Sequence, residues 1–295
     1  MEKAIEVRAW SNYINKIREF FVARGFTEVF TPSLVATGAF ESSLDCLKVS
    51  FSTGELELHT SPEIEMKACL AETKLPIFQI CKSYRDDPPT PIHSREFTML
   101  EYYRPEVDYL TTRQDMKELL NHVAGRSLAF EEISVRELAL KSTGLDLEKL
   151  STTELLHAAI AKVRIIETSP DDTWDDLFFK LLLEKWEPAL HPTRPTILHD
   201  YPPSQSALAA INPKTGWAER FEIYWRGVEL CNGCTELTDI GELDRRYEKE
   251  KSLREKQRKV PHAYPQRLAS AMRNMPPASG VAVGLDRLFR IVRSN

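Results

Sequence analysis

Two strand-like stretches separated by a long polar segment constrain the possible folds of this chain most strongly. Residues 76–84 (PIFQICKSY) and 97–104 (FTMLEYYR) carry the aromatic and β-branched residues that strands favour. The twelve residues between them, RDDPPTPIHSRE, are mostly polar and too many for a tight hairpin turn. Loops of that length are usually functional or disordered. We therefore predict two strands of a sheet with a functional loop between them.

The second of these strands carries chemically useful side chains on one face. Alternation along the strand places four residues together: Phe97, Met99, Glu101 and Tyr103. A half-buried strand with solvated polar residues would show the same pattern. Arg85 at the start of the loop and His93 near its end favour a functional interpretation, because cationic and donor groups beside this face suit a phosphate chain.

Regularly spaced glutamates mark residues 218–237, AERFEIYWRGVELCNGCTEL, which we interpret as a hairpin turning at Arg226 and Gly227. Glu222 and Glu229 then lie on neighbouring strands and could share a hard cation such as Mg²⁺, which takes one or two carboxylates plus phosphate oxygens. Evenly scattered surface acids would explain the spacing equally well.

A third glutamate, Glu236, lies an odd number of residues beyond Glu229, so a regular strand points the two side chains to opposite faces. If both served one site, the strand would need a bulge or bend near Asn232 and Gly233, and we predict one there on that condition.

The rest of the chain reads as helices with short extended segments. Apolar residues at helical spacing predict an amphipathic helix over 5–24, ended by Gly25. Residues 26–35 predict an edge strand that Pro32 interrupts. We also expect polar helices over 109–160, an aromatic-rich helix over 174–186, a charged helix over 240–260 and a final strand and helix over 279–292.

A further predicted helix carries a carboxylate in its first turn. The stretch LELHTSPEIEMKACLAE predicts a strand ending at Thr60, Ser61 as the N-cap and Pro62 at the first helical position. Glu63 would therefore lie at the N-terminus of a helix.

Composition limits the function classes. With 39 basic and 44 acidic residues, the net charge of −5 argues against binding nucleic acid through bulk charge. The charged N-terminal residues exclude a signal-peptide core, and no apolar run is long enough for a membrane span, so we expect a soluble, cytoplasmic protein. Five cysteines predict free thiols, and CNGC (231–234) lacks the second ligand pair of a structural zinc site.

Taken in order, these segments resemble the catalytic core of class II aminoacyl-tRNA synthetases of the lysyl branch. GFTEVFTP with Pro32 is similar to the first motif of that class, SYRDDPPTPIHSREFTMLEYYR to the second, and SGVAVGLDRL with Arg287 to the third. The resemblance implies an α+β fold with a mainly antiparallel sheet flanked by helices, and a homodimer. It also implies one catalytic domain over 1–295, with a possible small helical insertion at about 145–190.

Within that branch, TSPE, EFTMLEYYRPEVDY and YPPSQSALA resemble the ligases that attach (R)-β-lysine to elongation factor P. Ser61 and Ala282 match that ligase family, whereas lysyl-tRNA synthetases usually have alanine and glycine there. Only about five residues precede the first predicted helix, so we expect no anticodon-binding domain and no anticodon-type recognition of tRNA.

The resemblance implies roles for individual residues. Arg85 and Arg287 would be catalytic, and Glu222 and Glu229 would ligate Mg²⁺. The ATP site would consist of Arg85, Asp86, Asp87, His93, Ser94, Phe97, Glu229, Leu230, Gly284 and Arg287. The amino-acid site would consist of Ser61, Pro62, Glu63, Glu101, Tyr103, Asn232, Glu236 and Ala282.

The leading hypothesis is an ATP-dependent ligase that activates lysine or (R)-β-lysine as an aminoacyl adenylate and transfers it to a lysine of elongation factor P. Two alternatives stay open. One is a truncated lysyl-tRNA synthetase or another amino-acid-activating enzyme. The other is a non-catalytic module that binds amino acid or nucleotide, because Asp86, Asp87, Ser94 and Arg95 depart from the family pattern, as does Cys234 in place of a usual phenylalanine.

Overall fold

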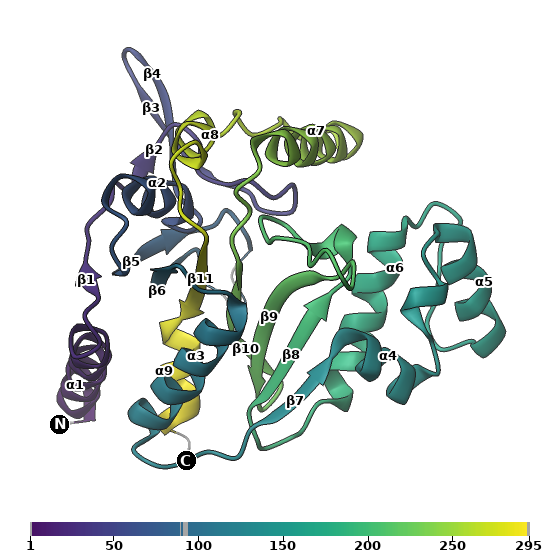
Figure 1. Ribbon diagram of the computed structural model, residues 1–295, viewed down its shortest axis with the longest axis horizontal. Helices are drawn as coiled ribbons and strands as arrows, with labels where there is room; N and C mark the ends of the chain where they lie inside the picture. Colours follow the sequence, from purple (N-terminus) through teal and green to yellow (C-terminus); the bar gives the residue numbers. More distant parts are fainter. Residues whose placement is uncertain (1, 89, 91–93, 294–295) are drawn as a thin grey trace. The chain divides into compact units, whose positions relative to one another are not determined.

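The computed structural model describes residues 2–88, 90 and 94–293, which form two compact units (Figure 1). The first unit comprises Met1–Ser127, Ala207–Ala210 and Leu230–Asn295, and the second comprises Leu128–Ser206 and Ile211–Glu229. Whether they act as the single catalytic domain expected from the sequence stays a prediction. None of the helices in the described part of the chain has the length and apolar character that crossing a bilayer requires.

The first unit contains a mainly antiparallel sheet. β1 (Thr27–Glu28) runs parallel to β5 (Ile77–Tyr84), and β5 pairs antiparallel with β6 (Glu96–Pro105). β6 pairs antiparallel with β11 (Ala278–Gly284), which in turn pairs with β10 (Val228–Thr235), a strand that belongs to this unit from Leu230 onward. A smaller sheet has the order β2 (Leu34–Val35), β4 (Gly54–Leu58), β3 (Leu47–Phe51).

Helices flank these strands. They are α1 (Glu2–Val22), α2 (Glu63–Thr73), α3 (Tyr109–Ala124), α7 (Ile240–Lys256), α8 (Gln266–Met272) and α9 (Leu285–Arg293). The predicted first helix is confirmed: Ile14, Ile17 and Phe21 of its apolar stripe are buried, and Phe21 stacks on Phe78 with ring centroids 5.0 Å apart. Gly25 follows the helix with φ +79°, a left-handed conformation that glycine adopts without strain.

The second unit contains β7 (Glu131–Ser134), β8 (Thr196–Tyr201) and β9 (Ala218–Trp225), with β7 parallel and β9 antiparallel to β8. Its helical elements are α4 (Val135–Thr143), η1 (Leu147–Lys149), α5 (Thr153–Val163), α6 (Trp174–Leu181), the π-helical turn η2 (Leu182–Trp186), η3 (Glu187–Ala189) and η4 (Pro203–Gln205). The predicted α+β class, with mainly antiparallel strands and flanking helices, is confirmed. Residues 145–190 are largely helical, and their status as an insertion stays a prediction.

The predicted hairpin turn is confirmed. Arg226 (φ +56°) and Gly227 (φ +72°) both adopt the left-handed backbone conformation between β9 and β10. Two successive residues with positive φ are what a two-residue type I′ turn requires, since this turn matches the twist of the flanking strands. The local sequence was sufficient here because the turn depends on these two residues alone.

Two local predictions were wrong, and the conditional prediction of a bulge in β10 is not supported by its pairing with β11. Pro62, not Ser61, occupies the N-cap position of α2, and its carbonyl accepts a hydrogen bond from the Met66 amide at 2.9 Å. β10 pairs with β11 without interruption from Cys231 to Thr235, so this pairing contains no bulge at residues 232–233. Residues 131–134 form β7 within the predicted helical stretch 109–160, because they pair with β8, a partner distant in sequence.

Candidate active site

β6 carries a buried carboxylate and phenol side by side. The hydroxyl of Tyr103 donates a hydrogen bond to Oε1 of Glu101 at 2.5 Å, and both side chains are buried. The second oxygen of Glu101, Oε2, is buried and has no hydrogen-bond partner among the described residues. An unsatisfied buried carboxylate oxygen is costly, so its position is suited to a ligand that donates a hydrogen bond.

A buried lysine connects two more carboxylates of the predicted amino-acid site. Lys67 lies one turn after Glu63 on α2, and its ammonium group is 2.5 Å from Oε1 of Glu63. The same Nζ lies 2.6 Å from Oε2 of Glu236, a close ion pair. The side chains of Lys67 and Glu236 are each only 2% exposed. The structure thus places Glu63 and Glu236 together, around a lysine that was not among the predicted site residues.

Burial and charge shift the titration of this cluster. Burial, helped by the neighbouring charge of Glu63, raises the pKa of Glu101 to about 8. Burial likewise raises the pKa of Glu236 to about 7, against the opposing effect of Lys67. For Lys67, burial alone would lower the pKa, but the charges of Glu236 and Glu63 hold it well above its ordinary value. Lys67 therefore stays charged near neutral pH, while Glu101 and Glu236 can gain or lose a proton there.

Strand pairing brings further predicted residues to the same place. Ala282 on β11 pairs with Glu101 on one side and with Asn232 on the other. Ser61 is half-buried and Pro62 buried at the start of α2, which also carries Glu63. The predicted amino-acid site is therefore assembled from α2, β6, β10 and β11 of the first unit.

Gly280 on β11 is a second residue that the sequence analysis missed. A β-carbon at this position would lie 2.3 Å from Cε1 of Tyr103 and 2.7 Å from Oε1 of Glu236. Such distances are far inside van der Waals contact, so only glycine leaves room for both side chains. A glycine within a strand is a sequence signal for close approach of this kind.

The Gly280→Ala variant tests this arrangement. We expect the added methyl group to displace Tyr103 and Glu236 and to weaken binding of a lysine-type amino acid by at least about tenfold, since each 1.4 kcal/mol of lost interaction is one factor of ten. Isothermal titration calorimetry with lysine measures this, and ATP affinity in the same sample is the control. Unchanged lysine affinity would show that the residues around Gly280 do not contact the amino acid.

The predicted nucleotide residues of the first unit surround the start of the β5–β6 loop. The guanidinium carbon of Arg85 lies 5.3 Å from the ring centroid of Phe97, and Nε of Arg85 is buried without a hydrogen-bond partner in the described structure. Asp86 is exposed and lies 3.7 Å from Arg95, and Asp87 is half-buried. Ser94 is exposed, and His93 lies outside the described residues. A guanidinium whose buried Nε has an unused donor fits an anionic ligand.

The residues that resemble the third class II motif lie at the junction of β11 and α9. Gly284 pairs with Met99 on β6, and Arg287 is half-buried in the first turn of α9. The carboxylate of Asp286 accepts a hydrogen bond from the amide of Thr98 at 2.6 Å, which fixes the start of α9 against β6. The predicted residue Leu230 is buried in β10.

The two predicted Mg²⁺ ligands belong to the second unit. Glu222 is buried on β9, where Tyr201 and Tyr224 (2.6 Å) donate to its Oε2 and Arg220 donates to its Oε1 at 2.6 Å. Glu229 is half-buried and follows the turn. Two carboxylates suit a hard cation, and Oε1 of Glu222 keeps one lone pair for it.

Comparisons with a protein-family model and with known proteins agree with one another. Residues 1–295 match the family of class II tRNA synthetases (D, K and N). An elongation factor P–(R)-β-lysine ligase homolog of Aquifex aeolicus is 37% identical over 289 residues, which cover 96% of this chain and 94% of that protein. The elongation factor P–(R)-β-lysine ligase of Mannheimia succiniciproducens is 36% identical, over 94% of this chain and 87% of that protein. The ligase of Haemophilus influenzae is 37% identical, over 94% of this chain and 88% of that protein.

Proposed function

The chain belongs to the class II tRNA synthetases, within the group of elongation factor P–(R)-β-lysine ligases, and from this premise we propose its reaction. It activates lysine or (R)-β-lysine with ATP and transfers the aminoacyl group to a lysine side chain of elongation factor P. The observation that carries the proposal is the cluster in which buried Lys67 pairs with half-buried Glu63 and buried Glu236, together with the buried carboxylate of Glu101.

The charge of this cluster matches a diamino acid. With a diamino acid bound, three ionised carboxylates and one ammonium group of the site would carry a net charge of −2, which the two ammonium groups of lysine or β-lysine would balance. Oε2 of Glu101 offers an acceptor that no described residue uses. Since buried charges are stable only when paired, the cluster favours substrates with two positive groups over neutral amino acids of the same length.

The first chemical step needs positioning more than acid–base catalysis. The substrate carboxylate is already ionised at pH 7, so it attacks the α-phosphorus of ATP directly, forms the acyl–phosphate bond and releases pyrophosphate. Arg85, with its unused buried donor, would bind the carboxylate and the α-phosphate, and Phe97 would stack on adenine. Arg287 and His93 would bind the outer phosphates. Mg²⁺ held by Glu222 and Glu229 would neutralise phosphate charge.

In the second step, the ε-amine of the acceptor lysine attacks the carbonyl carbon of the adenylate. An amide bond forms, the bond between the carbonyl carbon and the phosphate oxygen breaks, and AMP leaves with the electron pair. The attacking amine loses one proton. Because elongation factor P is a translation factor, we place this reaction in the cytoplasm.

Pyrophosphate exchange tests the proposal. Purified protein with ATP, Mg²⁺ and labelled pyrophosphate should form labelled ATP with lysine or (R)-β-lysine, but not with norleucine, which lacks the distal ammonium group. Exchange followed by charging of tRNA rather than of elongation factor P would favour a truncated synthetase. Nucleotide binding without exchange would identify a non-catalytic module and contradict the proposal.

Amino-acid binding should depend on pH. In the ligand-free site, burial gives Glu101 a pKa of about 8 and Glu236 a pKa of about 7, so both carboxyls are partly protonated near pH 7. A bound ammonium group favours the ionised forms, and binding therefore releases protons. We expect lysine affinity to rise between pH 6 and 8 and then to level off. Calorimetry in two buffers of different ionisation enthalpy measures the proton release, which Glu101→Gln should reduce; affinity that is flat or falls over this range would contradict the assignment.

We also propose that the protein is a homodimer through the segment around Pro32. Four large apolar side chains of α1 and the following segment are exposed in the single chain: Ile5 (58%), Val7 (61%), Val22 (61%) and Phe30 (80%). Large apolar side chains exposed along one continuous stretch of chain favour an interface there. Sedimentation equilibrium should give twice the chain mass of 33.8 kDa, with Phe30→Glu shifting the mass toward one chain. A monomeric wild type would contradict the proposal.

A further inference from the structure

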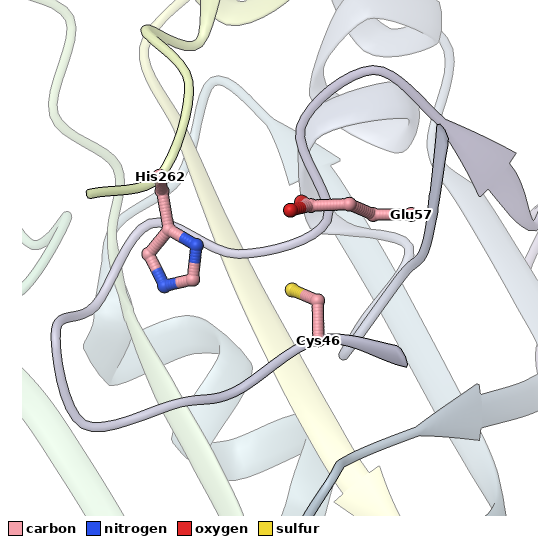
Figure 2. A group of neighbouring side chains, drawn as sticks. All are labelled: Cys46, Glu57 and His262. Carbon is pink, nitrogen blue, oxygen red and sulfur yellow. The ribbon is translucent and has the colours of Figure 1, made fainter. Parts of the chain in front are cut away.

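Three potential metal ligands converge in the first unit, apart from the residues of the candidate active site. Cys46 lies directly before β3, Glu57 lies on β4, and His262 lies between α7 and α8. One ligand atom from each side chain lies within 4.8 Å of the other two. Figure 2 shows the thiol, the carboxylate and the imidazole turned toward one another from three separate segments.

The histidine is held in the manner of a metal ligand. Nε2 of His262 lies 2.9 Å from the carbonyl oxygen of Leu44, which fixes the ring and leaves Nδ1 toward the other two side chains. Metal-binding histidines almost always donate their second ring N–H to a carbonyl or carboxylate in this way. Burial and the charge of Arg254 lower the pKa of His262, so the ring is neutral at pH 7, which is the form that binds metals.

The other two ligands are also held in place. Oε2 of Glu57 accepts a hydrogen bond from the amide of Gly38 at 2.8 Å. A β-carbon at position 38 would lie 2.9 Å from Sγ of Cys46, so glycine leaves the space that the thiol occupies. Burial and the neighbouring Glu57 raise the pKa of Cys46 to about 12, so the thiol is protonated without a metal.

Two nearby cations, Arg254 and Lys259, both pair with Asp45, and the net charge of +1 that remains is smaller than the two negative charges that Cys46 and Glu57 would offer a metal ion. The guanidinium of Arg254 lies 2.9 Å from Asp45, and its other contacts are to the carbonyls of Ser42, Leu44 and Val260. Lys259 lies 2.6 Å from the second oxygen of Asp45. A divalent cation would therefore meet the two potential negative charges of Cys46 and Glu57.

We propose that Cys46, Glu57 and His262 form a zinc site, with solvent as the fourth ligand. Thiolate, imidazole and carboxylate are the ligands that Zn²⁺ takes in proteins, at bond lengths that place tetrahedral ligand atoms about 3.3–3.8 Å apart. The side chains therefore need to move by on the order of one ångström. On binding, Zn²⁺ forms a bond to sulfur and the thiol proton passes to solvent. Such a site would join β3, β4 and the α7–α8 connection.

Cobalt titration of the full-length protein tests the site. After dialysis against chelator, Co²⁺ should bind with one ion per chain and give a near-ultraviolet sulfur-to-cobalt charge-transfer band that Zn²⁺ abolishes. Cys46→Ser should remove this band. Cys69→Ser is the matched control, because Cys69 is a partly buried thiol on α2 outside the cluster, and it should retain the band.

A second variant keeps the test decisive if Cys46→Ser does not fold. His262→Asn should bind Zn²⁺ at least tenfold more weakly, and Zn²⁺ should raise the melting temperature of the wild type and of Cys69→Ser but not of this variant. A wild type without the cobalt–sulfur band would overturn the proposal. A band that persists in Cys46→Ser, or equal zinc affinity in wild type and His262→Asn, would overturn it as well.

Discussion

The Arg85→Ala variant is expected to form the aminoacyl adenylate about 10²–10³ times more slowly than the wild type, with a nearly unchanged melting temperature. The buried Nε of Arg85 has no hydrogen-bond partner in the described structure, so its removal breaks no hydrogen bond of that nitrogen. In the reaction, however, the guanidinium would stabilise charge on both the attacking carboxylate and the α-phosphate. Pyrophosphate exchange measures the rate, and thermal unfolding measures the stability.

Arg95→Ala is the matched control for this prediction. Arg95 lies in the same loop, but its side chain is 57% exposed and contacts Asp86 and the carbonyl of Asp87. Its backbone carbonyl, which accepts from the amide of Arg85, is unaffected by the substitution. Arg95→Ala should therefore stay within about threefold of the wild-type rate, a change of less than 1 kcal/mol in the activation barrier. Equal rates for the two variants would show that Arg85 has no catalytic role.

The Lys67→Met variant is expected to lower the free energy of unfolding of the first unit by about 3–5 kcal/mol, because removing one partner of a buried ion pair leaves the other charge uncompensated. Here two carboxylates, Glu63 and Glu236, lose their shared ammonium group. Urea denaturation monitored by far-ultraviolet circular dichroism measures the loss. The double variant Lys67→Met/Glu236→Gln should recover part of it, since the unpaired buried charge is then removed.

A surface ion pair of similar length is the control for Lys67. Lys48 lies 2.8 Å from Glu55, but both side chains are about half exposed. Lys48→Met should therefore cost at most about 1 kcal/mol, because water screens exposed pairs. Equal destabilisation by the two lysine variants, or a double variant no more stable than Lys67→Met, would show that burial does not determine how much the Lys67 ion pairs contribute to the free energy of unfolding.

Features set by a few neighbouring residues were predictable from the sequence. The hairpin turn depends on Arg226 and Gly227 alone, and strands β5 and β6 were visible in their aromatic and β-branched residues. The pairing of Glu101 with Tyr103 followed from strand alternation. By contrast, β7 was missed because it depends on pairing with β8. The bulge that we predicted on the condition that Glu229 and Glu236 serve one site is not seen in the pairing of β10 with β11.

The sequence pattern did not predict that Lys67 lies at the centre of the amino-acid site. Lysine is rarely fully buried, so Lys67 on a predicted helix suggests a solvated side chain. Its spacing of four residues from Glu63 was a usable signal for an ion pair, but its second partner, Glu236, comes from a distant strand end. Cys46, Glu57 and His262 likewise have no regular spacing, because three separate segments bring them together.

The most direct test of the proposed function is the mass of elongation factor P after incubation with this protein, ATP, Mg²⁺ and (R)-β-lysine or lysine. We predict that one aminoacyl group is added to a single lysine of elongation factor P, that peptide mapping locates it on the side chain, and that Arg85→Ala abolishes it on the same time scale. Elongation factor P that stays unmodified while the protein actively exchanges pyrophosphate, or charges tRNA instead, would contradict the account.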